Sequence, residues 1–317
     1  MPADEDFLNL RVESIRRAAA NHRGAPPSAV DTERTQRVLA SGDARALDEV
    51  VHLLNRQVVA ALNALDLTAA DARLAELTEW RGVATEFVPA DLQGLPIRDW
   101  QLGALLGTRG QVLAFRGHAE RNIGLIDDAL VDFSEASKCF VEPADLERQA
   151  TYRLHGLVEK VRLGAELSDA ERLEVEVLVE SAPAADIGPE DWHPSAFRVA
   201  ACLKASHYLG LRPTWLNAMQ KRLEGLPDRV LPHPYAQVVG WLILLLPHPP
   251  RAFRRALATS AGQTADPLGA WIASSLQAPN GVVPSPPKQL AGWVEAYSME
   301  ALGREEGALA VLPFNYC

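Results

Sequence analysis

Arg148 and His155 are the residues whose types and spacing most directly suggest chemistry, because six residues separate an arginine from a histidine in one predicted helix. Other catalytic signatures are missing: the sequence contains no His-Glu-x-x-His, no Gly-x-Ser-x-Gly and no Gly-x-x-x-x-Gly-Lys-Ser/Thr motif. His193, His233 and His248 each precede a proline, which indicates turn residues just before helices rather than zinc ligands. We therefore expect neither a metal ion nor a cofactor.

The spacing of Arg148 and His155 resembles the signature of HEPN-type helical ribonucleases, in which an arginine is followed a few residues later by a histidine. That resemblance implies an effector enzyme that cleaves RNA with these two side chains. The sequence departs from the family at Gln149, where Asn or Asp is commoner. With 8 histidines and many arginines in the chain, such a spacing also arises by chance. We expect no catalytic residues, and the ribonuclease is the alternative.

Composition and charge narrow the class of protein. The chain has 317 residues, of which 48% are hydrophobic and 23% charged, as in ordinary globular proteins. A net charge of −10 gives it no global attraction for nucleic acid, so no nucleic-acid partner is expected. Its three widely spaced cysteines fit a reducing compartment. The acidic N-terminus lacks a secretory signal, and the longest apolar run, residues 238–246, is too short for a membrane span and predicts a buried helix. These features predict a cytoplasmic protein without membrane contact.

Apolar residues recur every three or four positions, which indicates amphipathic helices and an all-α fold. Proline- and glycine-containing breaks separate segments of mostly 12 to 22 residues, so we expect about 13 or 14 helices packed as antiparallel neighbours in an α-solenoid. Ser168 and Glu171 predict a capping box, and Asp145 is also expected to cap a helix. The longest break divides the chain into halves, residues 1–180 and 190–317, which we expect to be continuous.

Small and aromatic residues follow a regular pattern between residues 107 and 136. Gly110 stands where two helices of a pair would cross, and Gly117 stands where the first helix would close. The segment 129–136 follows with the spacing Ala-x-x-x-Phe-x-x-Ala. This pattern resembles one tetratricopeptide-repeat (TPR) unit, over residues 103–143, in which small side chains allow close helix crossing.

The resemblance has one departure. Residues 119–125 are extra relative to a standard unit, which predicts either an insertion or an unusually long turn between the two helices. Residues 146–164 would form the first helix of the next unit, and residues 44–88 would supply the preceding pair. The repeats are expected to be degenerate elsewhere, because each unit needs only the right apolar face.

The TPR resemblance implies a partner-binding groove lined by the first helix of each pair. Arginine suits recognition of carboxylates or backbone, and tyrosine offers flat contact area. The expected groove residues are Arg109, Gln111, Arg116, Arg148, Tyr152, Arg153 and His155. A secondary basic patch, which would meet an acidic partner or a phosphate, consists of Arg251, Arg254 and Arg255. For both sets the alternative is an ordinary solvated helix face.

Together these features predict a non-catalytic interaction scaffold or regulatory adaptor that binds another protein or a peptide. A second alternative is a structural subunit that forms homo-oligomers through its apolar C-terminal half. Some peptide-sensing bacterial regulators also have a TPR-like architecture. That class usually carries an N-terminal helix-turn-helix, which residues 1–43 do not present convincingly.

Overall fold

The computed structural model describes most of the chain between residues 99 and 277. The described ranges are 99–120, 122–141, 145–188, 195–226, 233–262 and 267–277, with the single positions 68, 69, 72, 231, 285 and 288. Within these ranges the secondary structure is helical and contains no strand, which confirms the all-α class. The expected helix pair at residues 44–88 lies outside the described residues, apart from three positions.

Nine α-helices and one 3-10 helix lie within the described residues. They are α5 (Asp99–Glu120), α6 (Ile123–Cys139), α7 (Leu146–Arg162), α8 (Asp169–Glu180), η3 (Ala184–Asp186), α9 (Ala196–Leu209), α10 (Leu216–Leu223), α11 (His233–Leu245), α12 (Arg251–Gly262) and α13 (Pro267–Gln277). The expected total of 13 or 14 helices also includes residues outside the described ranges, so this number stays a prediction.

Proline marks helix starts as predicted. α12 begins at Arg251, directly after Pro250, and α13 begins at Pro267 itself. A proline at the first turn is tolerated because the N–H that it lacks would have no partner there.

The helix caps follow the prediction at α8 but not at α7. At α8 the Ser168 hydroxyl accepts a hydrogen bond from the Glu171 backbone N–H at 3.3 Å, and the Glu171 carboxylate accepts one from the Ser168 N–H at 2.9 Å. This is a complete capping box. The prediction that Asp145 caps α7 is wrong, because its side chain makes no cap hydrogen bond and instead accepts one from Arg148.

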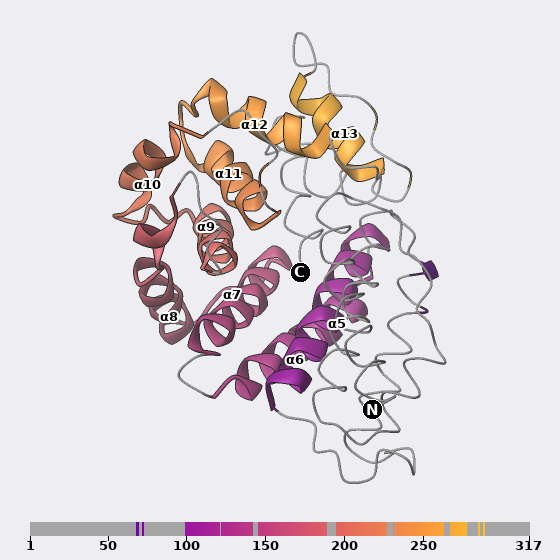
Figure 1. Ribbon diagram of the computed structural model, residues 1–317. Coiled ribbons are helices and arrows are strands. Elements are labelled where there is room, and N and C mark those ends of the chain that lie inside the picture. Colours follow the sequence, from indigo (N-terminus) through magenta and orange to yellow (C-terminus); the bar gives the residue numbers. More distant parts are fainter. Residues whose placement is uncertain are drawn as a thin grey trace, which may run out of the picture.

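The described helices follow one another around an arc (Figure 1). α7, α9 and α11 lie on the inner side of this arc, and α8, α10 and α12 lie on its outer side. α7 packs against α9, and α9 packs against α11, so the inner helices form a continuous row. α6 joins this row to α5 because it packs against both α5 and α7.

Glycines recur on the face of α5 that meets its neighbours. A Cβ added at any of four glycines would lie closer to a neighbouring side chain than van der Waals contact allows. The pairs are Gly103 with Phe140, Gly107 with Tyr152, Gly110 with Phe133, and Gly117 with Ile126. The close helix approach predicted at Gly110 is therefore present. At three of these glycines an aromatic ring fills the space that a side chain would take. The rings belong to Phe133 of α6, to Phe140 directly after α6 and to Tyr152 of α7.

Gly117 does not end the first helix, which is a correction to the prediction. α5 continues to Glu120, and only residues 121–122 link it to α6. Of the extra residues, 119–120 therefore lie in α5 and 123–125 in α6, so they do not form a long loop. Gly117 lies inside the helix, and the side chain of Ile126 packs against it.

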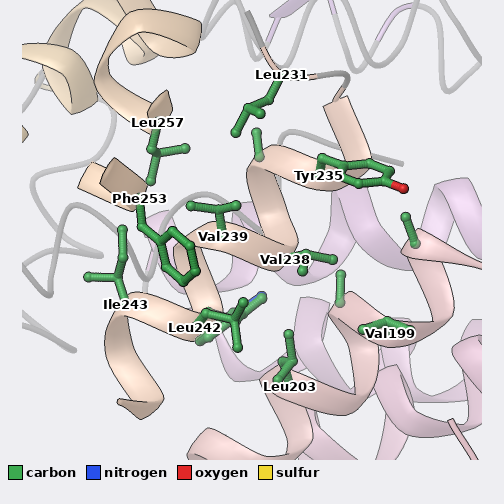
Figure 2. Close-up of a cluster of buried hydrophobic side chains, with 14 of the residues drawn as sticks. Val199, Leu203, Leu231, Tyr235, Val238, Val239, Leu242, Ile243, Phe253 and Leu257 are labelled. Carbon is green, nitrogen blue, oxygen red and sulfur yellow. The ribbon is translucent and has the colours of Figure 1, made fainter. Parts of the chain in front are cut away.

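α11 is apolar on several sides and lies between α9 and α12. Figure 2 shows Val239 and Ile243 beside Phe253 of α12, whereas Val238 and Leu242 point toward α9. A helix with apolar residues all round is expected to be buried, so the apolar run behaves as predicted. Neither α11 nor any other helix among the described residues is long and apolar enough to cross a membrane.

One hydrophobic cluster extends from Val112 on α5 to Ala273 on α13. A second, smaller cluster joins α7, α8 and α9. Both clusters contain residues from before and after the break near residue 190, so the described helices on its two sides share buried apolar surface. The division into halves 1–180 and 190–317 stays a prediction.

Candidate binding site

A hollow of about 130 Å³ lies between α6, α7 and α8. Its apolar lining includes the buried Phe133 and Leu157, and its charged lining consists of the partly exposed Arg153, Lys160 and Glu171. Leu130, Ser134, Tyr152 and Gly156 complete the lining. We call it the α6–α8 hollow. An apolar cavity of about 150 Å³ holds one benzene molecule, so this space suits a single large apolar side chain.

Gly156 is one of the residues that line this hollow. It lies in the middle of α7, and a Cβ built on it would lie 3.4 Å from the Cβ of Phe133, which is ordinary contact. Glycine in a helix interior costs about 1 kcal/mol relative to alanine. The sequence thus carries a destabilising residue at a position where a larger side chain would occupy the hollow.

Two ion pairs hold α8 against α7 beside the hollow. Arg153 donates to both carboxylate oxygens of Glu174 at 2.8 and 2.7 Å, and Lys160 donates to both oxygens of Glu171 at 2.8 and 3.0 Å. Hydrogen bonding to Glu174 raises the pKa of Arg153. The pKa of Glu171 is lowered to about 2, chiefly by the hydrogen bond from Lys160 and then by those from Ser168. These contacts neutralise the two basic side chains of the hollow.

A different set of charges is buried where α5, α7 and α9 meet. The Glu159 carboxylate accepts hydrogen bonds from Arg162 Nη1 at 2.8 and 3.1 Å, from Lys204 Nζ at 3.0 Å and from His118 Nε2 at 2.6 Å. The exposed fraction of these four side chains is 4% or less. We call this group the Glu159 network.

The Glu159 network fixes the charge state of its members. Burial raises the pKa of Glu159, but Arg162, Lys204 and the hydrogen bond from His118 outweigh it and hold the pKa well below its ordinary value. Burial, followed by the charge of Arg162, lowers the pKa of His118 to about 4. At neutral pH the imidazole is therefore neutral, and its Nε2–H donates to an ionised carboxylate.

Aromatic rings enclose the rest of this junction. His155 lies between Phe133 and Tyr152, with ring centroids 5.7 and 6.3 Å away, and burial lowers its pKa to about 3. The Arg162 guanidinium lies 5.2 Å from the ring centroid of Tyr208. Burial raises the pKa of Tyr208, and its hydroxyl has no hydrogen-bond partner among the described residues. No group of three or more His, Cys, Asp or Glu side chains in the described ranges is arranged to hold a metal ion.

Of the predicted groove residues on α7, two line the hollow. Tyr152 and Arg153 contribute to it directly. Arg148 is 57% exposed and pairs with Asp145 at 3.3 Å. His155 is partly buried and packs against the rings of Phe133 and Tyr152, and its role in a groove stays a prediction. Arg148 and His155 lie about 10 Å apart along the helix axis, and each has different neighbours.

The predicted groove residues on α5 lie outside the hollow lining. Arg109 pairs with the buried Asp132 at 3.3 Å, and Arg116 pairs with Glu120 one turn further along α5 at 2.9 Å. Gln111 is partly buried, and its Oε1 has no hydrogen-bond partner among the described residues. These side chains mainly stabilise α5 and its contact with α6.

The secondary basic patch is only partly exposed. Arg251 and Arg255 are exposed on α12, whereas Arg254 is partly buried and makes contacts of its own. The structure thus places two of the three guanidinium groups at the surface.

Sequence reasoning did not identify Gly156, Lys160 or the Glu159 network, and it identified Glu171 only as part of a helix cap. The Lys160–Glu171 pair spans 11 residues and the Lys204–Glu159 pair spans 45, so neither has a local spacing signal. The glycine was the one detectable sign, because an interior helix glycine usually has a packing or functional reason.

No match was found when the chain was compared with protein-family models, with curated proteins and with solved structures. Any function assigned to this chain therefore rests on the chemistry of its described side chains.

Proposed function

We propose that this chain is a non-catalytic helical scaffold that binds a segment of a partner protein, with the α6–α8 hollow holding one large side chain of that segment. The observation that carries the proposal is the hollow itself, whose lining includes Gly156, Tyr152 and Arg153. A tyrosine and an arginine beside an apolar pocket are the residue types that contribute most to binding at protein interfaces.

The proposed architecture is an array of TPR-like helix pairs. α5 with α6, α7 with α8 and α11 with α12 would be its units, since the helices of each pair pack together, and the order of inner and outer helices around the arc supports this. In this arrangement the binding site lies at the junction of two successive pairs, because α6 closes one side of the hollow and α8 the other. It therefore differs from a groove lined by the inner helices alone.

Filling the hollow tests this function. Gly156→Leu places an aliphatic side chain in the space that the partner would use, and Ala218→Leu is the matched control at an exposed position on α10. Wild type and both variants would first be compared by circular dichroism and urea unfolding. Proteins captured from a cell extract by wild type would then be purified, and their affinity for all three chains measured by calorimetry.

We expect Gly156→Leu to weaken binding at least tenfold, whereas Ala218→Leu binds like wild type. Equal affinities for wild type and a folded Gly156→Leu variant would show that the hollow is not the binding site. The milder Gly156→Ala variant separates occlusion from misfolding, because alanine favours the helix.

A further inference from the structure

The exposed apolar side chains are concentrated on one part of the molecule. Among the described residues, the six large hydrophobic side chains that are strongly exposed all lie between residues 123 and 177, on α6, on α8, at the first residue of α7 or in the link before it. They are Ile123, Val131, Val141, Leu146, Leu173 and Val177, with exposed fractions from 52% to 64%. The described part of α9 to α13 contributes none. Exposed apolar surface concentrated in this way marks an interaction site.

The two helices beside α7 are acidic. α6 carries four carboxylates and one lysine, and α8 carries five carboxylates and one arginine. α7 is basic, but the two cations that it contributes to the hollow, Arg153 and Lys160, are paired with carboxylates of α8. The charges beside the hollow are therefore balanced, and the net charges of α6 and α8 as whole helices are negative.

Five of these carboxylates have no ion-pair partner among the described residues, and one of the five, Glu180, accepts hydrogen bonds from Thr214. Asp127 and Asp128 are exposed on α6, and Asp169 and Glu176 are exposed on α8. Like charges gathered on a surface create a potential that attracts the opposite charge and repels anionic partners. A nucleic acid or an anionic membrane would be repelled here, whereas a cationic segment would be attracted.

We propose that the partner segment is a basic peptide in which one large aliphatic or aromatic residue is flanked by lysine or arginine. Its apolar side chain enters the α6–α8 hollow, and its cations face the carboxylates of α6 and α8. This inference rests on the proposed function and specifies the chemistry of the partner.

The test begins with a displayed library of random 12-residue peptides selected on the full chain. Enriched sequences would be synthesised with a fluorophore, and their affinities measured by anisotropy at low and high salt. Three variants are compared with wild type: Gly156→Leu, the neutralised triple variant Asp127→Asn/Asp128→Asn/Glu176→Gln, and the control Asp186→Asn/Glu224→Gln. The control removes exposed carboxylates from η3 and from the end of α10, which do not line the hollow.

We expect enriched peptides to carry lysine or arginine within three residues of a large apolar residue. The neutralised variant should bind them at least about 3-fold more weakly at low salt, since each exposed charge pair contributes about 0.2–1 kcal/mol. The control should bind like wild type, and the difference should shrink as salt is added.

The outcomes separate this inference from the proposed function. One outcome is a set of peptides that bind Gly156→Leu more weakly than wild type and yet lack basic residues, or bind the neutralised variant as tightly as wild type. Such peptides would overturn the basic-peptide inference alone. Peptides that bind Gly156→Leu as well as wild type, or a library without enrichment, overturn both proposals. Self-association detected by light scattering and abolished by Gly156→Leu would identify a second copy of the chain as the occupant and overturn the basic-peptide inference.

Discussion

α7 presents two faces whose charged residues are organised differently. On the face toward the hollow, Arg153 and Lys160 each pair with one carboxylate of α8, and all four side chains remain 22% to 38% exposed. On the face toward α5 and α9, Glu159 accepts from three donors and is 1% exposed. Residues 153 and 160 differ from 159 in direction because the α-helix repeats every 3.6 residues.

The difference shows that an ion pair and a buried charge network have different roles in one helix. Exposed pairs contribute little to stability and can be rearranged by a ligand. A buried carboxylate surrounded by donors fixes the relative positions of its helices, because moving a donor away takes a hydrogen bond from a charge in a poorly solvated space. α7 therefore combines an adaptable surface with a rigid support.

The largest expected effect is on the buried face. Glu159→Gln removes the negative charge from the buried Arg162 and Lys204, so we expect the free energy of unfolding to fall by about 3–5 kcal/mol. The measurement is urea unfolding followed by circular dichroism. Adding Lys204→Met should recover part of the loss, because it removes one uncompensated cation. A loss below about 1 kcal/mol, the range of an exposed pair, would show that the two faces of α7 do not differ in this way.

Lowering the pH should reduce the stability of the folded chain through the buried face of α7. The unfolded chain binds a proton at His118 below pH 6.5, whereas the folded chain does so only near pH 4. Stability therefore falls as the pH drops from 6.5 to 4, by on the order of 3 kcal/mol for this residue. His155 acts in the same direction, since its pKa is lowered to about 3. A His118→Gln/His155→Gln variant should lose most of this slope, and a wild-type stability that is constant from neutral pH down to about pH 4 would contradict the expected loss.

Adding one methyl group should have opposite effects at two helical glycines. Gly107→Ala overlaps the ring of Tyr152, so we expect a loss of about 1–3 kcal/mol. Gly156→Ala has room beside Phe133 and should stabilise α7 by up to about 1 kcal/mol. Thermal and urea unfolding of the two variants give the signs directly. Destabilisation by both would mean that the space over Gly156 is not open in solution.

The smallest expected effect is at the exposed pairs. Glu174→Gln removes the partner of Arg153, and we expect a change of about 0.2–1 kcal/mol because the pair is partly solvated. Unfolding measured at low salt and at about 0.5 M salt should show the difference shrinking with screening. An effect as large as that of Glu159→Gln would remove the distinction between the two faces.

Local features of the fold could be predicted from the sequence. The capping box at Ser168, the helix start at Pro267 and the close crossing at Gly110 depend on residues within a few positions or on one residue's own conformational limits. The prediction at Gly117 was wrong because a glycine can either end a helix or allow a neighbouring side chain to approach the backbone. The packing of Ile126 against Gly117 shows that the second case applies, and the local sequence does not contain that contact.

The candidate site was predicted only in part. Tyr152 and Arg153 were identified because they lie on an amphipathic helix of a recognisable pattern. The ring contact of His155 with Phe133 and the effect of Lys204 on its pKa both involve residues that are far from it in sequence. Helix periodicity gives the direction of a side chain but not the neighbour that it meets.

The Glu159 network also sets an order of events during synthesis of the chain. His118 precedes Glu159 by 41 residues, and Lys204 follows it by 45. At roughly 5–20 residues per second, Lys204 is added about 2–9 s after Glu159. A nascent chain that ends within this interval contains the carboxylate, Arg162 and His118 but not the lysine that completes the group. The junction of α5 and α7 therefore reaches its final form only after α9 has left the ribosome.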